Sequence, residues 1–220
     1  MNNIEFYRFG PLLGKTTINE ELRLELLETG IIQTINARNS LVGHIENEKK
    51  YSIELIKKFE PKIMEYIDDY IQSASNEKNL IKSKYKSILN SLWINRQIES
   101  EHNPPHYHRG GQISFIIYLN FPKEIQMETP LYDELHPGSI QFLYGLTNDI
   151  DTDYNINTFI KKILSPNDNI THIPATGEMF IFPSYLLHYV SPFYTKGIER
   201  ISVSGNISIV DIKTPTNNLI

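Results

Sequence analysis

The spacing of apolar residues changes at about residue 88, and this change restricts the folds open to the chain. Before it, apolar residues recur at helical intervals with charged residues between them, as in residues 53–73. After it, β-branched and aromatic residues follow a period of two, in runs separated by Gly, Pro, Asn or Asp. These runs are residues 91–100, 112–120, 138–145, 178–184, 186–193 and 200–212. Closely spaced short strands of this kind predict a sandwich or jelly roll, so we expect an α+β chain in which a helical N-terminal layer packs on an all-β core.

Two helices are predicted in the N-terminal part. Residues 17–30 begin with Thr17 and Glu20 in the register of a capping box and end at Gly30. Within residues 53–73, Pro61 predicts a kink or the junction of two helices. The polar residues 41–52 between the helices are predicted to form a loop.

The length of 220 residues fits one domain, with residues 1–90 as a helical support region and residues 91–212 as the β core. We expect residues 146–158 to form a mobile acidic loop and residues 214–220 to form a frayed tail.

Composition excludes several classes of protein and site. The net charge is −5, with 26 acidic and 21 basic residues and no basic block, which argues against a nucleic-acid-binding protein. No apolar run approaches the roughly 20 residues that span a bilayer, and the N-terminus lacks the layout of a signal peptide, so we expect a cytoplasmic protein without membrane contact. Cysteine is absent, so the ligands of any bound metal are His, Asp, Glu or backbone oxygen, which favours iron, manganese or zinc.

The stretch "HNPPHYHRGG" (102–111) precedes the run at 112–120 and brings histidines together. His106 and His108 lie two residues apart, so in an extended segment both side chains point to the same side. Taken alone, this stretch is either a histidine-rich turn or half of a metal site.

A second group of polar residues occurs in the C-terminal strands. His188 lies in a nearly continuous apolar run, and Arg200 and Ser202 follow it in "ERISVSGN". Burying the charge of Arg200 requires an anionic partner, and the neighbouring strands offer no obvious acidic residue. A bound carboxylate ligand, clamped by Arg200 and hydrogen-bonded by the hydroxyl of Ser202, would supply that partner.

Three segments together resemble the Fe(II)/2-oxoglutarate-dependent oxygenases, in particular the small members found in marine bacteria and their phages. They are "NPPHYHRGGQISFIIYLNFP", "GEMFIFPSYLLHYVSPF" and "ERISVSGNI", and the resemblance covers roughly residues 91–210. It implies a double-stranded β-helix (a cupin-like jelly roll), with Fe(II) and 2-oxoglutarate as cofactors. His106 would be the first iron ligand and His188 the distal one.

The resemblance also implies which residues hold the cosubstrate. Arg200, assisted by Ser202, would bind the C5 carboxylate of 2-oxoglutarate. Tyr118, on the strand after the first ligands, could reach the same end of the molecule, and Asn95 could hydrogen-bond it.

The chain departs from the family at the middle ligand. The family pattern is His-x-Asp or His-x-Glu, whereas His108 lies two residues after His106 and is followed two residues later by Gly110. Either all three histidines bind the metal, or His108 is the proximal ligand of a two-histidine site completed by water or an anion.

The implied reaction couples oxidative decarboxylation of 2-oxoglutarate, with O2, to oxidation of a substrate, usually by hydroxylation. The substrate would be a small molecule or a peptide, and the enzyme could be phage-encoded and act in the host cytoplasm. The apolar N-terminal helices could pair two subunits in a homodimer. Two alternatives remain open: a cupin-like three-histidine metalloenzyme that does not use 2-oxoglutarate, and a non-catalytic β-sandwich binding module.

Overall fold

The computed structural model describes residues 10–78, 80, 84–130, 136–145 and 169–212. The predicted acidic loop 146–158 and the tail 214–220 lie outside the described residues. No helix in the described part of the chain is long and apolar enough to cross a bilayer.

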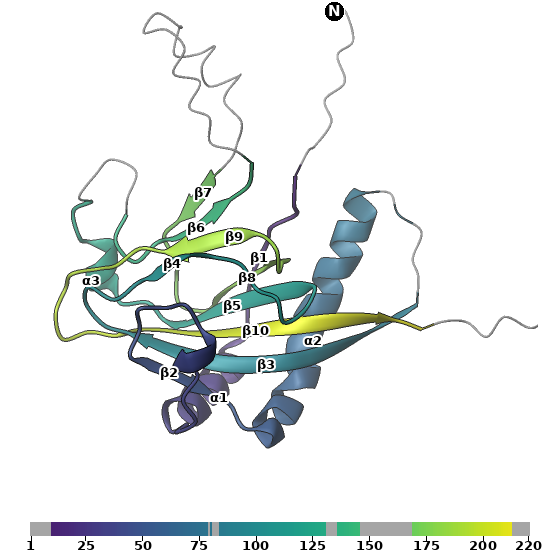
Figure 1. The fold of residues 1–220 in the computed structure, drawn as a ribbon, viewed down its shortest axis with the longest axis horizontal. Helices are drawn as coiled ribbons and strands as arrows, with labels where there is room; N and C mark the ends of the chain where they lie inside the picture. The colour runs from purple at the N-terminus through teal and green to yellow at the C-terminus, as the bar shows by residue number, and fades with distance from the viewer. Residues whose placement is uncertain (1–9, 79, 81–83, 131–135, 146–168, 213–220) are drawn as a thin grey trace, which may run out of the picture.

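Two antiparallel sheets form the body of the protein (Figure 1). The major sheet has the order β1-β8-β5-β10-β3-β2, and the minor sheet has the order β4-β9-β6-β7. The strands of the major sheet are β1 (Gly14–Thr17), β2 (Asn47–Lys50), β3 (Tyr85–Gln97), β5 (Ile113–Asn120), β8 (Glu178–Pro183) and β10 (Arg200–Asp211). Those of the minor sheet are β4 (Asn103–His106), β6 (Ile140–Leu143), β7 (Asn169–His172) and β9 (Leu187–Val190). The two sheets form the predicted double-stranded β-helix.

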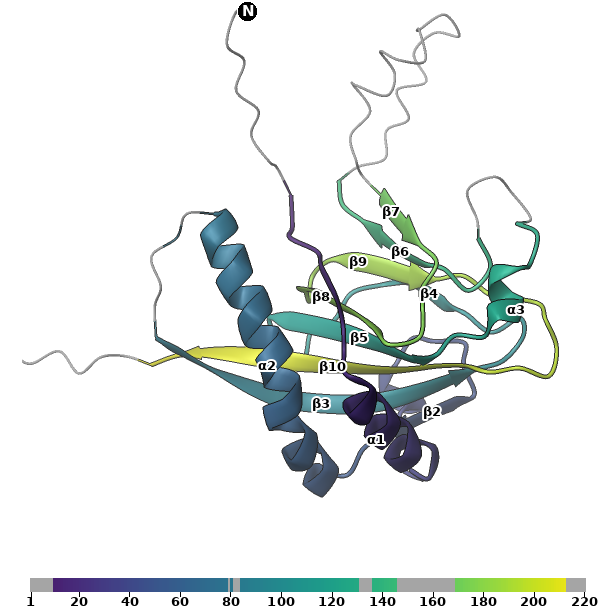
Figure 2. The same cartoon turned by 180° about the vertical axis from the view of Figure 1, so that it is seen from behind.

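Helices α1 (Glu20–Ile31) and α2 (Ile53–Glu77) cover the outer face of the major sheet (Figure 2). Alternate residues of the long strands point toward them, so the period of two found in the sequence places one apolar row of each strand under the helices. The resulting core contains Leu22, Leu26, Phe59, Ile63, Ile67, Leu92, Ile94, Phe115, Ile117 and Val203. The shorter elements are η1 (Arg38–Ser40) and α3 (Lys123–Gln126).

The opposite face of the major sheet looks toward the minor sheet and has two different halves. On β5 and β8 it is apolar, and Ile116, Tyr118, Phe180 and Phe182 form a second core together with Phe142 and Val190 of the minor sheet. On β3 and β10 the corresponding positions are largely polar and buried: Asn95, Gln97, Arg200, Ser202, Ser204 and Asn206. This polar half carries three of the predicted cosubstrate residues, Asn95, Arg200 and Ser202.

The structure corrects the prediction for the first helix. The predicted capping box is wrong, because Thr17 belongs to β1 and pairs with Glu178, and the helix is capped by Asn19, whose side chain accepts a hydrogen bond from the backbone N–H of Leu22 (2.8 Å). Gly30 lies inside the helix, where an added Cβ would clash with the Tyr51 hydroxyl. That glycine therefore permits close packing of helix on sheet and does not end the helix.

Two further predictions differ from the structure. Residues 53–73 lie in one helix that continues through Pro61, so of the two alternatives predicted for Pro61 the junction of two helices is wrong. The predicted loop 41–52 contains β2, which pairs with β3 at the edge of the major sheet.

Candidate active site

Three histidines lie together where β4 meets β9. His106, at the end of β4, is the register partner of His188 on β9, so the sheet itself places both side chains side by side. His108 follows in the loop after β4, which is held by a hydrogen bond from the His108 N–H to the Ser184 carbonyl (2.8 Å). One ring nitrogen from each of His106, His108 and His188 lies within 4.8 Å of the others, and this cluster contains no carboxylate. The structure thus favours the three-histidine alternative.

The backbone hydrogen bonds of His106 and His188 engage Nδ1 and leave Nε2 to face the cluster. The Nδ1 atoms of His106 and His188 lie 2.7 and 2.9 Å from the carbonyl oxygens of Pro104 and Leu186, contacts that an Nδ1–H group makes as donor. The lone pair of each is then on Nε2. The Nε2 atoms of His108 and His188 lie 3.2 Å apart, close to the roughly 3 Å expected between neighbouring ligands with metal–nitrogen bonds of about 2.1 Å.

Burial keeps the three imidazoles neutral. It lowers the pKa of His106, lowers that of His108 to about 4, and lowers that of His188 well below the ordinary value. A metal binds the neutral form of imidazole, so the environment favours the ligand form of each ring.

The three histidines line a cavity of about 880 Å³ that extends to the polar half of the major sheet. Arg200 lines this cavity and is fully buried, with 1% of its surface exposed. Its Nη1 donates to the Gln97 Oε1 (2.5 Å), and its guanidinium lies 4.9 Å from the centre of the Tyr118 ring. Its Nε and Nη2 atoms are buried without any hydrogen-bond partner, and no described acidic residue forms an ion pair with it. Two unpaired donors on a buried cation fit a carboxylate ligand.

The contrast with Arg96 shows that this arrangement is specific. Arg96 lies on the other face of the sheet, where it makes a bidentate pair with Glu199 at 2.8–3.0 Å and remains partly exposed. Arg96 therefore has the acidic partner that Arg200 lacks.

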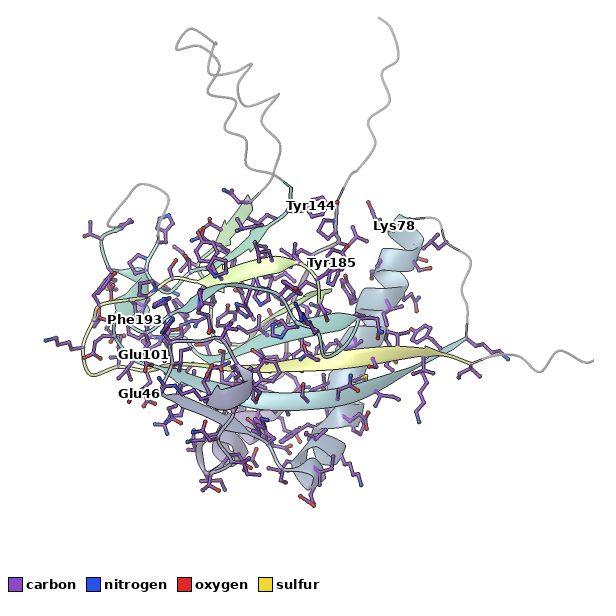
Figure 3. The ribbon with its side chains drawn as sticks, viewed as in Figure 1. Glu46, Lys78, Glu101, Tyr144, Tyr185 and Phe193 are labelled. Atoms are coloured by element: carbon purple, nitrogen blue, oxygen red, sulfur yellow. The ribbon has the colours of Figure 1, made fainter. Side chains whose placement is uncertain are left out.

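Gln97 holds the Arg200 side chain in place, and sequence reasoning did not identify this residue. Its Nε2 donates to the carbonyl oxygen of Glu101 (2.5 Å), which turns Oε1 toward Arg200. The Glu101 carboxylate in turn accepts hydrogen bonds from the N–H groups of Glu46 (2.8 Å) and Ile98 (2.9 Å). Figure 3 shows Glu46, Glu101 and Phe193 close together at this end of the major sheet.

The other predicted cosubstrate residues lie around Arg200. Asn95 and Ser202 are register partners, and both line the cavity. The Asn95 Nδ2 donates to the Ser204 hydroxyl (3.5 Å), whereas its Oδ1 is buried and unpaired. Tyr118 is the register partner of Ser202 on the next strand and lies against the Arg200 guanidinium, with a buried hydroxyl that has no partner. The structure brings all of the predicted site residues together.

Two other cavity residues were not predicted. The Trp93 ring lies 5.7 Å from that of His108, and so supports the metal side of the cavity. Glu48 of β2 is also buried in the wall. The alternation of Trp93, Asn95 and Gln97 along β3 could have indicated a shared inner face, but Glu48 lies in residues predicted to be a loop.

The residues present fit both groups that the sequence resemblance implies. Three neutral imidazoles with converging nitrogens suit a divalent first-row metal, and the unpaired guanidinium nitrogens suit a dicarboxylate.

Comparisons with solved structures give distant similarities. A prolyl-4-hydroxylase from Pseudomonas putida is 12% identical, with 92% of this chain and 93% of that chain covered and a TM-score of 0.48. A collagen prolyl hydroxylase of Paramecium bursaria Chlorella virus-1 is 15% identical, with 89% and 94% covered and a TM-score of 0.47. A 2OG-Fe(II) oxygenase family oxidoreductase from Burkholderia pseudomallei is 14% identical with a TM-score of 0.36, and the match covers 56% of this chain and 44% of that chain.

No curated protein matches the sequence. Residues 91–206, more than half of the chain, match the protein family described as "Putative 2OG-Fe(II) oxygenase". This segment contains all seven of the predicted site residues, from Asn95 to Ser202. The chain therefore belongs to the 2OG-Fe(II) oxygenases, a family of oxidoreductases whose cofactors are Fe(II) and 2-oxoglutarate.

Proposed function

We propose that the protein is a 2-oxoglutarate-dependent hydroxylase that oxidises a C–H bond of a small molecule or peptide. The observation that carries the proposal is the buried, unpaired Arg200 in the same cavity as the three histidines. A metal site alone would not need this arginine, whereas 2-oxoglutarate has a second carboxylate for which the arginine is a matched partner.

Each residue of the site has a defined task in this proposal. His106, His108 and His188 hold Fe(II) through their Nε2 atoms, and the carbonyl oxygens of Pro104 and Leu186 fix the ring orientation of the first and last. Bound Fe(II) and 2-oxoglutarate, together with O2, would supply the oxidising chemistry: one oxygen atom would go to succinate, formed with release of CO2, and the other to the substrate.

The cosubstrate is positioned by the chain's own polar groups. Arg200 binds the C5 carboxylate with its free Nε and Nη2, and Ser202 adds a hydroxyl from the same strand face. Tyr118 supports the guanidinium from the β5 side, while Asn95 contributes its Nδ2 to the same row and keeps its Oδ1 unpaired. The apolar half of the inner face, with Ile116 and Phe182, limits the access of water.

The test is an anaerobic titration of the Fe(II)-loaded protein with 2-oxoglutarate, followed by the visible charge-transfer absorption of the chelate. We expect the band in the wild type and in Arg96→Ala, and its loss in Arg200→Ala. Iron binding without a band in the wild type would favour the cupin-like enzyme that does not use 2-oxoglutarate, and a band of unchanged affinity in Arg200→Ala would remove Arg200 from the site.

Metal content separates the two ligand sets. We expect His106→Ala, His108→Ala and His188→Ala each to lose bound Fe(II), and His44→Ala, outside the cluster, to keep it. Full iron in the His106→Ala variant would support the two-histidine alternative, in which His108 is the proximal ligand, while full iron in either of the other two would refute the site assignment.

A further inference from the structure

Glu48 is a buried carboxylate in the wall of the cavity that the proposed reaction does not use. Only 1% of its surface is exposed, and its Oε2 is buried without a hydrogen-bond partner. No described residue forms an ion pair or a hydrogen bond with its side chain. The opposite charge that acts on it belongs to Arg38, which is exposed and forms no ion pair or hydrogen bond with it, whereas Glu101 adds a like charge. Burial therefore raises the pKa of Glu48 to about 7.

Neighbouring groups at this end of the cavity are also hydrogen-bond acceptors. A Cβ added to Gly43 would clash with the Oδ1 of Asn103 and lie 2.9 Å from the Oε1 of Glu48, so both oxygens adjoin the same glycine. Asn95 is the register partner of Glu48 on β3, and its Oδ1 is buried and unpaired. Glu48, Asn95 and Asn103 all line the cavity, and Glu48 and Asn95 each present a buried oxygen that lacks a donor.

2-Oxoglutarate cannot supply that donor. It is an anion without N–H groups, and its proposed partner, Arg200, lies on β10, two strands away from β2 in the sheet order. At about 4.8 Å per strand, this separation is roughly 10 Å. The cavity thus has a donor end at Arg200 and an acceptor end at Glu48, and the acceptor end is left for a second molecule.

We propose that Glu48, with the amide oxygens of Asn95 and Asn103, binds a protonated amino or guanidinium group of the substrate. The inference deepens the proposed function, because it assigns the oxidised molecule to a chemical class: a cationic, nitrogen-containing compound or a peptide with a basic side chain. A cation that reaches this pocket gains a charge-assisted pair with a desolvated carboxylate. It also relieves the cost of an unpaired buried acid.

The experiment measures binding of two fragment probes, methylguanidine and methylamine, to the full-length protein loaded with Zn(II) and 2-oxoglutarate, by NMR titration. N-methylurea serves as the neutral isostere of the first probe. Glu48→Gln removes the charge with little change of shape. Glu46→Gln makes the same chemical change two residues away, on an exposed side chain.

We expect at least one cationic probe to bind the wild type and Glu46→Gln with similar affinity. The same probe should bind Glu48→Gln at least tenfold more weakly. N-methylurea should show the same affinity for all three proteins. Which probe binds more tightly separates an amine from a guanidinium. Equal affinity in Glu48→Gln, or no binding of either cation to the wild type, would overturn the proposal. Binding that appears only in Arg38→Gln would show that Arg38 neutralises Glu48 in solution, and would overturn it as well.

The same titration without 2-oxoglutarate keeps this inference separate from the proposed function. If the charge-transfer band is absent but the cation still binds through Glu48, only the 2-oxoglutarate assignment is refuted and the substrate class stands. If the band forms but no cation binds, only the cationic substrate class is refuted and the proposed function stands.

Discussion

Replacing Arg200 by methionine should abolish 2-oxoglutarate binding without weakening the fold. Methionine retains a long side chain but removes the charge and its two unpaired nitrogens, Nε and Nη2. An unsatisfied buried donor costs about 1–3 kcal/mol, so the substitution relieves a cost of this size at each nitrogen. Against this, the Gln97 Oε1 loses its donor, at about 1–3 kcal/mol, and the stacking on Tyr118 is lost, at about 1–2 kcal/mol.

These contributions nearly cancel, and we expect the free energy of unfolding to change by less than about 2 kcal/mol. If Arg200 were instead in a buried charge pair, removing it would cost about 3–5 kcal/mol. The size of the stability change therefore distinguishes an unpaired Arg200 from a paired one. The assay is urea unfolding of the Mn(II)-loaded protein, with and without 2-oxoglutarate.

The stabilisation by bound 2-oxoglutarate should differ much more between the wild type and Arg200→Met. At a concentration of 100 Kd, 2-oxoglutarate stabilises the wild type by about 2.7 kcal/mol. A hundredfold loss of affinity in Arg200→Met would leave about 0.4 kcal/mol at the same concentration. Arg96→Met is the matched control: its partly exposed pair with Glu199 is worth about 0–1 kcal/mol, and the ligand effect should persist. A loss above about 3 kcal/mol in ligand-free Arg200→Met, or undiminished stabilisation by 2-oxoglutarate, would refute the reasoning.

Three further substitutions test the surroundings of the site. The pKa of Glu48 is raised from its ordinary value of 4.5 to about 7 in the folded state, so the wild type loses stability as the pH rises from 4.5 through 7. Glu48→Gln should match the wild type at pH 4.5 and exceed its free energy of unfolding by about 3 kcal/mol at pH 8 in urea unfolding, and a constant difference across this range would contradict the assignment. Gly111→Ala places a Cβ against the backbone carbonyl of Ile207 and should cost about 1–3 kcal/mol, measured as a lower Tm; an unchanged Tm would show that the histidine loop can move aside. Gly30→Ala should also lower the Tm although alanine favours helices, because its methyl group displaces the Tyr51 hydroxyl; a raised Tm would mean that helix propensity prevails.

The long strands could be predicted from the sequence because the types and spacing of the side chains on their two faces give a recognisable strand pattern. The run predicted at 112–120 is β5, Ile113–Asn120, and the run at 200–212 is β10, Arg200–Asp211. Both strands pair on each side, so tertiary contacts reinforce the same pattern that the sequence shows.

Two of the short strands, β2 and β4, could not be predicted because their pairing is imposed by neighbours. β2 reads "NEKK" and β4 reads "NPPH", and neither has the apolar or β-branched residues typical of a strand. β4 tolerates Pro104 and Pro105 because it lies at the edge of the minor sheet and its register with β9 is irregular there. The loss of β2 from the prediction also concealed Glu48, so the acceptor end of the cavity could be found only from the structure.

The candidate metal and cosubstrate residues were found from the sequence because they combine residue types that a core does not otherwise accommodate. Gln97 was missed for the opposite reason: a glutamine on a strand is unremarkable until its Oε1 is seen to contact a buried arginine.

The division of the inner sheet face offers a physical reason to regard the cavity as a binding site. β5 and β8 present Ile116, Phe180 and Phe182 toward the minor sheet, as a sandwich held together by apolar packing would do throughout. From β10 onward the same face presents Arg200, Asn95 and Glu48 instead, with unpaired donors or acceptors on each. Groups of this kind cost stability in the free protein and return it only when a ligand pairs with them. Because the unpaired donors lie at Arg200 and the unpaired acceptors at Asn95 and Glu48, a single dicarboxylate cannot satisfy both ends, and the cavity is suited to bind an anion and a cation side by side.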